Sequence, residues 1–356
     1  MNKLDKIEIN QYRGIKNMTL DNLSRVNVLV GENNSGKTSI LEAIQLLSNP
    51  FSESLLFHIV FRRLGVVRIK SDNHIGEMLK EILKWIFPQG ADGRHQPIEL
   101  SLQHGDKKTP VSFELVEQEF VDVGLFMKSR EDSFATTSRL PTKVEHRIGV
   151  KIANEEKVMK LSEKIPLDDE SKNSLYESTH IIHGDDFRNI SPEQIGIVIL
   201  SLKKSELIKI LKQFDNEITG IEIIPIGEDT QIYIQKNRKE LMPLTSFGDG
   251  LQKIVYIASK LLNIQNGVLL LDEAEVSIHT KMIPTFFEWI SKLAKQHDVT
   301  VFMTTHSIEA VDGLLAANKE SLEDLSFYRL EKSGAKFLSG KRMYRIRYDF
   351  AMEVRG

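Results

Sequence analysis

One segment of the chain has the residue types and the spacing that bind the phosphates of a nucleotide. Residues 31–38 read GENNSGKT and match the pattern G-x-x-x-x-G-K-[ST]. In such a loop, backbone N–H groups surround a phosphate, the glycines allow close approach, and the next helix adds the positive end of its dipole. The lysine can reach the β- and γ-phosphates, and the threonine hydroxyl can be a ligand of Mg²⁺. The residues expected to bind nucleotide are Gly31, Asn33, Asn34, Ser35, Gly36, Lys37, Thr38 and Ser39.

Two carboxylates at the end of an apolar segment could complete this site. Asp272 and Glu273 directly follow the apolar residues 268–271. An acidic side chain at the carboxyl end of a buried parallel strand can hold Mg²⁺ beside a phosphate loop. An adjacent carboxylate can orient or deprotonate the attacking water. The alternative is a strand that ends in solvated acids, and the phosphate loop favours the catalytic interpretation.

Two further segments could meet a phosphate. His306 follows the apolar residues 299–303, which places it at the same sheet edge as the two acids and favours a γ-phosphate sensor over a structural histidine. Residues 246–250 read SFGDG and open a helix. They are either an ordinary helix start capped by Ser246 or Asp249, or a second anion-binding helix start that meets the γ-phosphate held by a partner subunit.

Apolar periodicity predicts the elements that must position these residues. After residue 241, helices and strands alternate, which indicates a parallel sheet covered by helices. The predicted strands are 7–9, 26–30, 98–102, 111–115, 221–226, 231–234, 268–271 and 299–303. The predicted helices are about 38–47, 251–263, 281–294 and 307–315, with residues 51–90 mostly helical. Another helix is expected to begin at Ser191, which would cap it in a capping box with Gln194, and residues 129–143 are expected to form a polar loop.

Composition limits the class of protein. The chain has 356 residues, a formal net charge of −3 and no cysteine. The length predicts roughly two domains. The charge argues against a strongly basic nucleic-acid coat, and the lack of cysteine excludes a disulfide scaffold, a thiol nucleophile and cysteine-based metal centres. Without a signal peptide or a long apolar run, we expect a cytoplasmic protein with no membrane partner.

The order of these motifs resembles the ABC-type ATPase heads of the SMC, RecF and OLD group. GENNSGKT, SFGDG, LLLDEAE and TTHS follow one another along the chain, and residues 10–15 (NQYRGI) resemble the strand that precedes the phosphate loop in that group. Residues 243–253 (PLTSFGDGLQK) and 272–279 (DEAEVSIH) look most similar to the OLD-family AAA ATPases of phage-defence loci. The resemblance covers residues 7–48 and 241–315.

The resemblance implies a role for each matched position, with ATP and Mg²⁺ as cofactors. The implied catalytic residues are Lys37, Glu273 and His306, and the implied metal ligands are Thr38, Asp272 and Gln89. Arg13 would contact the nucleotide, while Ser246 and Gly248 would close on ATP held by the opposite subunit. Asp249 departs from the pattern by adding an anion near a phosphate, so engagement of the partner's nucleotide is expected to be weak or dependent on Mg²⁺.

The expected fold is an α/β P-loop NTPase of the ABC ATPase-head type, with a mixed β-sheet core, an antiparallel β subdomain and a helical insertion. The core would comprise residues 1–94 and 241–356, the β-rich subdomain 95–165, and the helical insertion or lid 166–240. No heptad run is long enough for SMC arms. Only 356 − 306 = 50 residues follow His306, too few for the Toprim nuclease domain of OLD nucleases.

Three functions remain open on this evidence. The first is a dimeric ATPase switch, or a larger even-numbered assembly, that controls a separate effector such as a Toprim-type nuclease in an anti-phage or nucleic-acid-related system. The second is a RecF-like DNA-binding repair ATPase. Two basic stretches, within residues 62–70 and 341–347, keep it open, although the modest net charge argues against it. The third is a scaffold that binds ATP with little hydrolysis, against which the intact set of Asp272, Glu273 and His306 argues.

Overall fold

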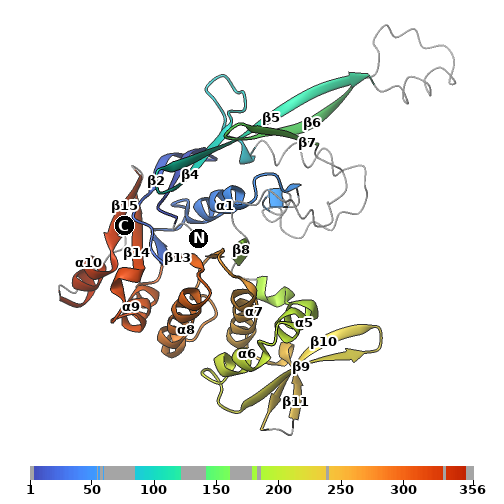
Figure 1. The fold of residues 1–356 in the computed structure, drawn as a ribbon, viewed down its shortest axis with the longest axis vertical. Coiled ribbons are helices and arrows are strands. Elements are labelled where there is room, and N and C mark those ends of the chain that lie inside the picture. The colour runs from blue at the N-terminus through green and yellow to red at the C-terminus, as the bar shows by residue number, and fades with distance from the viewer. Residues whose placement is uncertain are drawn as a thin grey trace, which may run out of the picture. The chain divides into compact units, whose positions relative to one another are not determined.

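The computed structural model divides the chain into two compact units (Figure 1). The residues it describes are 4–53, 55–56, 59, 85–121, 142–160, 179–182, 186–237, 240–331 and 334–349. The first unit comprises Met1–Ile7, Met18–Ser48 and Leu175–Gly356, and the second comprises Glu8–Asn17 and Asn49–Ser174. This division differs from the expected domains, because residues 175–240 belong to the unit that carries the motifs and residues 49–94 belong with the β-rich segment.

A six-stranded mixed sheet forms the centre of the first unit, in the order β15-β14-β3-β13-β12-β8. Its strands are β3 (Val26–Val30), β8 (Thr179–Ile182), β12 (Val268–Leu271), β13 (Thr300–Thr305), β14 (Leu325–Glu331) and β15 (Gly334–Ser339). Only the β14–β15 pair is antiparallel. Because β3, β13 and β12 are parallel neighbours, their carboxyl ends meet at one edge, and the phosphate loop, Asp272, Glu273 and His306 follow these ends.

Helices cover both faces of this sheet. Helix α1 (Lys37–Ser48) lies on one face, and α7 (Asp249–Asn263), α8 (Ile283–Gln296) and α9 (Ile308–Ala317) lie on the other (Figure 1). Alternate strand residues point to opposite faces, so Leu269 and Leu271 of β12 join the core beneath α7 and α8. Among the described helices, none combines the length and apolar character needed to cross a membrane.

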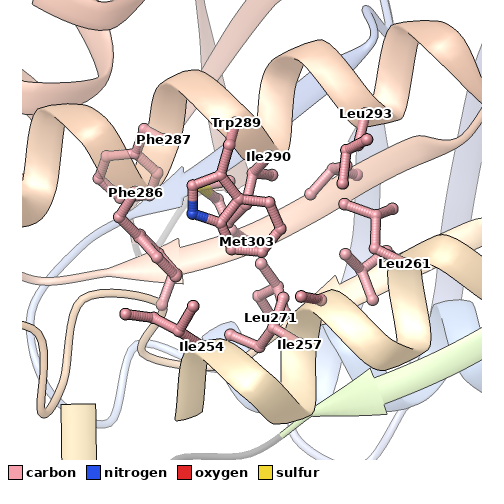
Figure 2. Close-up of a cluster of buried hydrophobic side chains, with 14 of the residues drawn as sticks. Ile254, Ile257, Leu261, Leu271, Phe286, Phe287, Trp289, Ile290, Leu293 and Met303 are labelled. Atoms are coloured by element: carbon pink, nitrogen blue, oxygen red, sulfur yellow. The ribbon is translucent and has the colours of Figure 1, made fainter. Parts of the chain in front are cut away.

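A cluster of large apolar side chains fixes the strand ends (Figure 2). Phe286 and Trp289 of α8 form an edge-on ring pair with centroids 5.7 Å apart, and Ile254 and Ile257 of α7 face them. Leu271 and Met303 lie in the same cluster and are both 1% exposed. Each is the residue directly before a polar residue of the site, Asp272 or Thr304, so the core holds the backbone from which these side chains project.

The first unit contains two further layers. Helices α5 (Pro192–Leu200) and α6 (Lys204–Leu211) contact α7, and an antiparallel sheet has the order β11-β10-β9. Its strands are β9 (Ile218–Ile226), β10 (Asp229–Lys236) and β11 (Glu240–Pro243). A short helix, α10 (Gly340–Tyr344), continues into a π-helical turn, Arg345–Asp349.

The second unit contains most of a six-stranded sheet with the order β2-β1-β4-β5-β6-β7. The strands are β1 (Lys6–Tyr12), β2 (Ile15–Leu20), β4 (Ile98–His104), β5 (Lys107–Val121), β6 (Thr142–Ile152) and β7 (Glu155–Lys160). β4 to β7 pair in antiparallel order, each strand with the next. In β4, the buried Ile98 and Leu100 alternate with the exposed Glu99, so this strand has one buried and one exposed face.

The predicted strands and most predicted helices are confirmed, and two local predictions are wrong. Ser191 precedes α5 but makes no side-chain capping bond; it hydrogen-bonds the Glu193 carboxylate instead and so lowers the pKa of Glu193. Residues 142 and 143 begin β6 rather than ending a loop, and residues 129–141 lie outside the described part. Of residues 51–90, positions 53, 55–56, 59 and 85–86 are helical, and most of the other positions lie outside the described part of the chain.

Candidate nucleotide-binding site

The phosphate loop connects β3 to α1, as the sequence predicts. Asn34 and Gly36 have φ angles of 65° and 89°, a left-handed conformation that lets the loop turn back on itself. Lys37 is 7% exposed, and its Nζ donates to the carbonyls of Gly31 at 2.8 Å and Glu32 at 2.7 Å. The ammonium is therefore held inside the loop, where a phosphate that the loop surrounds would meet it.

Charge around Lys37 is balanced by three carboxylates. Burial lowers the pKa of Lys37, and the nearby carboxylates of Asp272, Glu273 and Glu275 oppose this by favouring the charged form. This electrostatic coupling indicates that the acids at the end of β12 act on the ammonium of the loop. The structure thus brings together the two halves of the site that are 235 residues apart in sequence, since 272 − 37 = 235.

Each carboxylate oxygen of Asp272 accepts a hydrogen bond from a threonine hydroxyl. The Thr38 hydroxyl donates to Oδ2 at 2.9 Å, and the Thr304 hydroxyl donates to Oδ1 at 2.7 Å. A hydroxyl and a carboxylate are the oxygen donors that Mg²⁺ takes, and Mg²⁺ typically uses only one or two carboxylates together with water and phosphate oxygens. The pair of Thr38 and Asp272 therefore fits a nucleotide-bound Mg²⁺.

Glu273 has an unusual backbone. Its φ angle is 49°, a left-handed conformation that costs a non-glycine residue about 1 kcal/mol or more. Its N–H donates to the Thr304 hydroxyl at 2.8 Å, so one threonine contacts both acids. Its side chain is half-buried, unlike the buried Asp272, so water can reach its carboxylate. This difference suits a metal ligand followed by a residue that acts on water.

His306 lies where the sequence places it, directly after β13 and exposed. The turn that carries it is held by Thr305, whose hydroxyl donates to Glu275 Oε1 at 2.6 Å and accepts from the N–H of Ser307 at 2.9 Å. Ser307 in turn caps α9 by accepting from the N–H of Ala310 at 3.2 Å. The histidine therefore projects from a fixed turn that is linked to the loop after β12.

The segment SFGDG starts α7 without the cap that one interpretation expected. The N-cap residue is Gly248, and no side chain caps the helix, so neither Ser246 nor Asp249 has that function. Ser246 and Gly248 are both exposed. The carboxylate of Asp249 accepts a hydrogen bond from Arg188 at 2.9 Å, and this cation offsets the negative charge that Asp249 adds near the helix start.

Two predicted site residues lie in the second unit. Arg13 has a φ angle of 51°; its guanidinium lies over the ring of Tyr12, and its Nε donates to the Tyr12 hydroxyl at 3.2 Å. Gln89 is exposed and forms an isolated bridge with His95. Both residues belong to the second unit, whereas the phosphate loop belongs to the first. The nucleotide contact of Arg13 and the metal contact of Gln89 therefore stay predictions.

Thr304 and Glu275 were not assigned a function from sequence. Thr304 is fully buried, and Glu275 is 8% exposed with no hydrogen-bond partner for Oε2 among the described residues. Both occur in quoted motifs, TTHS and DEAE. The signal that could have found Thr304 is a polar residue at the end of an otherwise apolar strand, because a buried polar side chain there needs a hydrogen-bond partner.

Replacing Thr304 with valine should weaken Mg²⁺-dependent ATP binding, because Thr304 holds Asp272, the predicted Mg²⁺ ligand. Valine keeps the shape but removes the hydroxyl shared by Asp272 and the N–H of Glu273, so a buried carboxylate oxygen loses its donor at a cost of about 1–3 kcal/mol. We expect a lower urea midpoint and a higher Mg²⁺ concentration for half-maximal ATP binding. Thr300→Val, at the other end of β13, is the matched control. An unchanged Mg²⁺ requirement would show that Thr304 does not hold the metal ligand.

The fold and this geometry define a P-loop nucleotide-binding protein with a mixed α/β core. The chain belongs to the family described as "AAA domain, putative AbiEii toxin, Type IV TA system", whose model matches residues 26–312. The match contains the phosphate loop, SFGDG, the two acids and His306. The predicted fold class, a P-loop NTPase with a mixed sheet, is therefore confirmed.

Proteins with related sequences include an ATP/GTP phosphatase and a DNA replication and repair protein. An ATP/GTP phosphatase from Helicobacter pylori is 25% identical over 342 residues, covering 87% of this chain and 86% of that protein. The DNA replication and repair protein RecF of Staphylococcus epidermidis is 37% identical over 70 residues, which is 20% of this chain and 18% of RecF. Among solved structures, the SMC head domain from Thermotoga maritima covers 95% of this chain and 98% of its own at 12% identity, with a TM-score of 0.48.

Proposed function

We propose that this protein binds ATP with Mg²⁺ and hydrolyses it to ADP and phosphate. The observation that carries the proposal is the hydrogen-bonded chain from Thr38 through Asp272 and Thr304 to Glu273, directly beside the buried ammonium of Lys37. Family membership and the phosphatase from Helicobacter pylori support it. Phosphoryl transfer needs mainly positioning and charge neutralisation, and these residues supply both.

Each residue has a separate part in the proposed reaction. Lys37 neutralises charge on the β- and γ-phosphates, and Thr38 with Asp272 would hold Mg²⁺, which when bound supplies further positive charge to the phosphates. Glu273 orients the attacking water and accepts its proton. His306 lies at the same edge of the sheet and would contact the γ-phosphate.

ATP should also join two copies of the chain. Ser246 and Gly248 are exposed at the uncapped start of α7, and a helix start of this kind attracts anions. We infer that they meet the γ-phosphate held by Lys37 of a second copy, so the active form is a homodimer or an even-numbered assembly. ATP can shift this equilibrium because it contacts both subunits only in the closed form.

A mixing experiment tests the composite site. Lys37→Ala subunits and Ser246→Arg subunits should each be inactive alone. When mixed, they should recover part of the ATPase activity, because each mixed dimer has one site with both an intact Lys37 and an intact Ser246. Exchange between subunits is checked with fluorescent labels. No recovery in subunits that exchange would contradict the shared site and favour a monomer.

The proposed output is control of a separate effector, such as a nuclease, in an anti-phage or toxin–antitoxin setting. The family description supports this setting, and so does the resemblance of residues 243–253 and 272–279 to OLD-family ATPases. A RecF-like DNA-dependent ATPase is the second candidate, supported by the RecF relatives. Of the basic residues at 341–347, Arg347 is paired with Asp312 at 2.7 Å, which reduces the charge available to DNA. Turnover stimulated by DNA in a salt-sensitive manner would favour this candidate.

A further inference from the structure

One buried cation of the first unit has no part in the reaction proposed above. Lys253 of α7 is 1% exposed, and its Nζ donates to the backbone carbonyls of Glu273 at 3.0 Å and Val276 at 2.8 Å. Burying an ammonium group is costly unless it is paired or hydrogen-bonded. A methionine or leucine at this position would join the apolar face of α7 without that cost. The lysine therefore serves the loop that it contacts.

That loop carries Glu273 in its left-handed conformation. The N–H of Glu273 is bound by Thr304, and its carbonyl accepts from Lys253 and from the N–H of Val276 at 3.1 Å. The peptide groups on both sides of the Glu273 Cα are thus fixed, and with them the direction in which the side chain leaves the backbone. A strained φ angle persists only where the surroundings impose it, and Lys253 and Thr304 supply this restraint.

Helix α7 and the loop after β12 also touch directly. A Cβ atom at Gly250 would lie 2.7 Å from the carbonyl oxygen of Ser277, so the helix start packs against the loop with no space for a side chain. Next to Lys253, Ile254 anchors α7 in the apolar cluster with α8 (Figure 2). The start of α7, which bears Gly248, and the loop that bears Glu273 should therefore move together.

We propose that Lys253 is a positioning residue for hydrolysis, which fixes the Glu273 side chain and ties its direction to the placement of the α7 N-terminus. When a phosphate draws this helix start toward it, Lys253 carries the displacement to the Glu273 carbonyl. Closure of the dimer would in this way set the catalytic carboxylate. The inference rests on the proposed ATP hydrolysis.

Steady-state ATPase assays on full-length Lys253→Met and Gly250→Ala test this inference. The first variant removes the link, and the second displaces the same loop without removing a charge. We expect kcat to fall about tenfold to a hundredfold in both, because a small misplacement of a catalytic group has effects of that size. KM and the Kd for a non-hydrolysable ATP analogue should stay within about twofold, since nucleotide contacts are kept. Lys260→Met, on the same helix, should behave as the wild type.

The outcomes separate this inference from a structural role and from the proposed function. Thermal unfolding checks that each variant is folded, and if Lys253→Met does not fold, Gly250→Ala decides alone. A lower melting temperature with unchanged kcat would show that Lys253 only stabilises the fold. A loss of kcat matched by an equal loss of analogue binding would also overturn the inference. A wild-type protein without turnover would contradict the proposed function and this inference together.

Discussion

Lys37→Ala is expected to lower ATP turnover by about a thousandfold, because it removes the positive charge nearest the transferred phosphate. The carbonyls of Gly31 and Glu32 hold the ammonium inside the loop, where a bound phosphate would meet it. Loss of the Lys37 ammonium also leaves the carboxylates of Asp272, Glu273 and Glu275 without a nearby positive charge. ATPase assays at saturating ATP measure the effect.

The control for this variant is Lys319→Ala, an exposed lysine beyond the end of α9 that lies away from the strand ends of the site. It should keep wild-type turnover. If Lys37→Ala also keeps it, the phosphate loop is not the catalytic site and the proposed function is wrong. Urea unfolding separates a loss of chemistry from a loss of fold, since replacing a buried lysine with alanine leaves a cavity that can also lower stability.

Glu273→Gln is expected to slow hydrolysis by at least about a hundredfold while ATP still binds. Glutamine keeps the shape of the side chain but cannot accept the proton of the attacking water. Asp272 keeps both of its hydroxyl donors, so the metal site is unaffected. ATP-bound dimers should therefore accumulate and be visible by size-exclusion chromatography with light scattering.

Glu288→Gln, an exposed residue of α8, is the matched control and should hydrolyse ATP normally. Asp272→Asn should behave differently from Glu273→Gln, because it weakens Mg²⁺-dependent binding itself. If the Glu273 variant turns over at the wild-type rate while the Asp272 variant still binds Mg²⁺, the two carboxylates have been assigned the wrong functions.

The local sequence is sufficient to predict the strands and helices that carry the residues of the site. The sequence predicts a strand at residues 268–271, which is β12, because an apolar run of four residues is too short for a helix and suits a fully buried strand. The prediction that the Ser191 side chain caps α5 is wrong, for a reason that the sequence does not reveal. Its hydroxyl can bond either the backbone of the first turn or the Glu193 carboxylate, and the choice depends on side-chain geometry.

The sequence by itself determined the chemistry of each motif: a lysine and a threonine in a phosphate loop, two acids after a strand, and a histidine after the next. Tertiary structure decided which polar groups meet. The parallel register pairs Leu271 with Met303, so Asp272 and Thr304 become neighbours, and this register depends on contacts between strands distant in sequence. Likewise, only the packing of α7 against the loop after β12 brings Lys253 to the Glu273 carbonyl. Motif spacing encodes what a residue can do, whereas non-local packing determines which partner holds it.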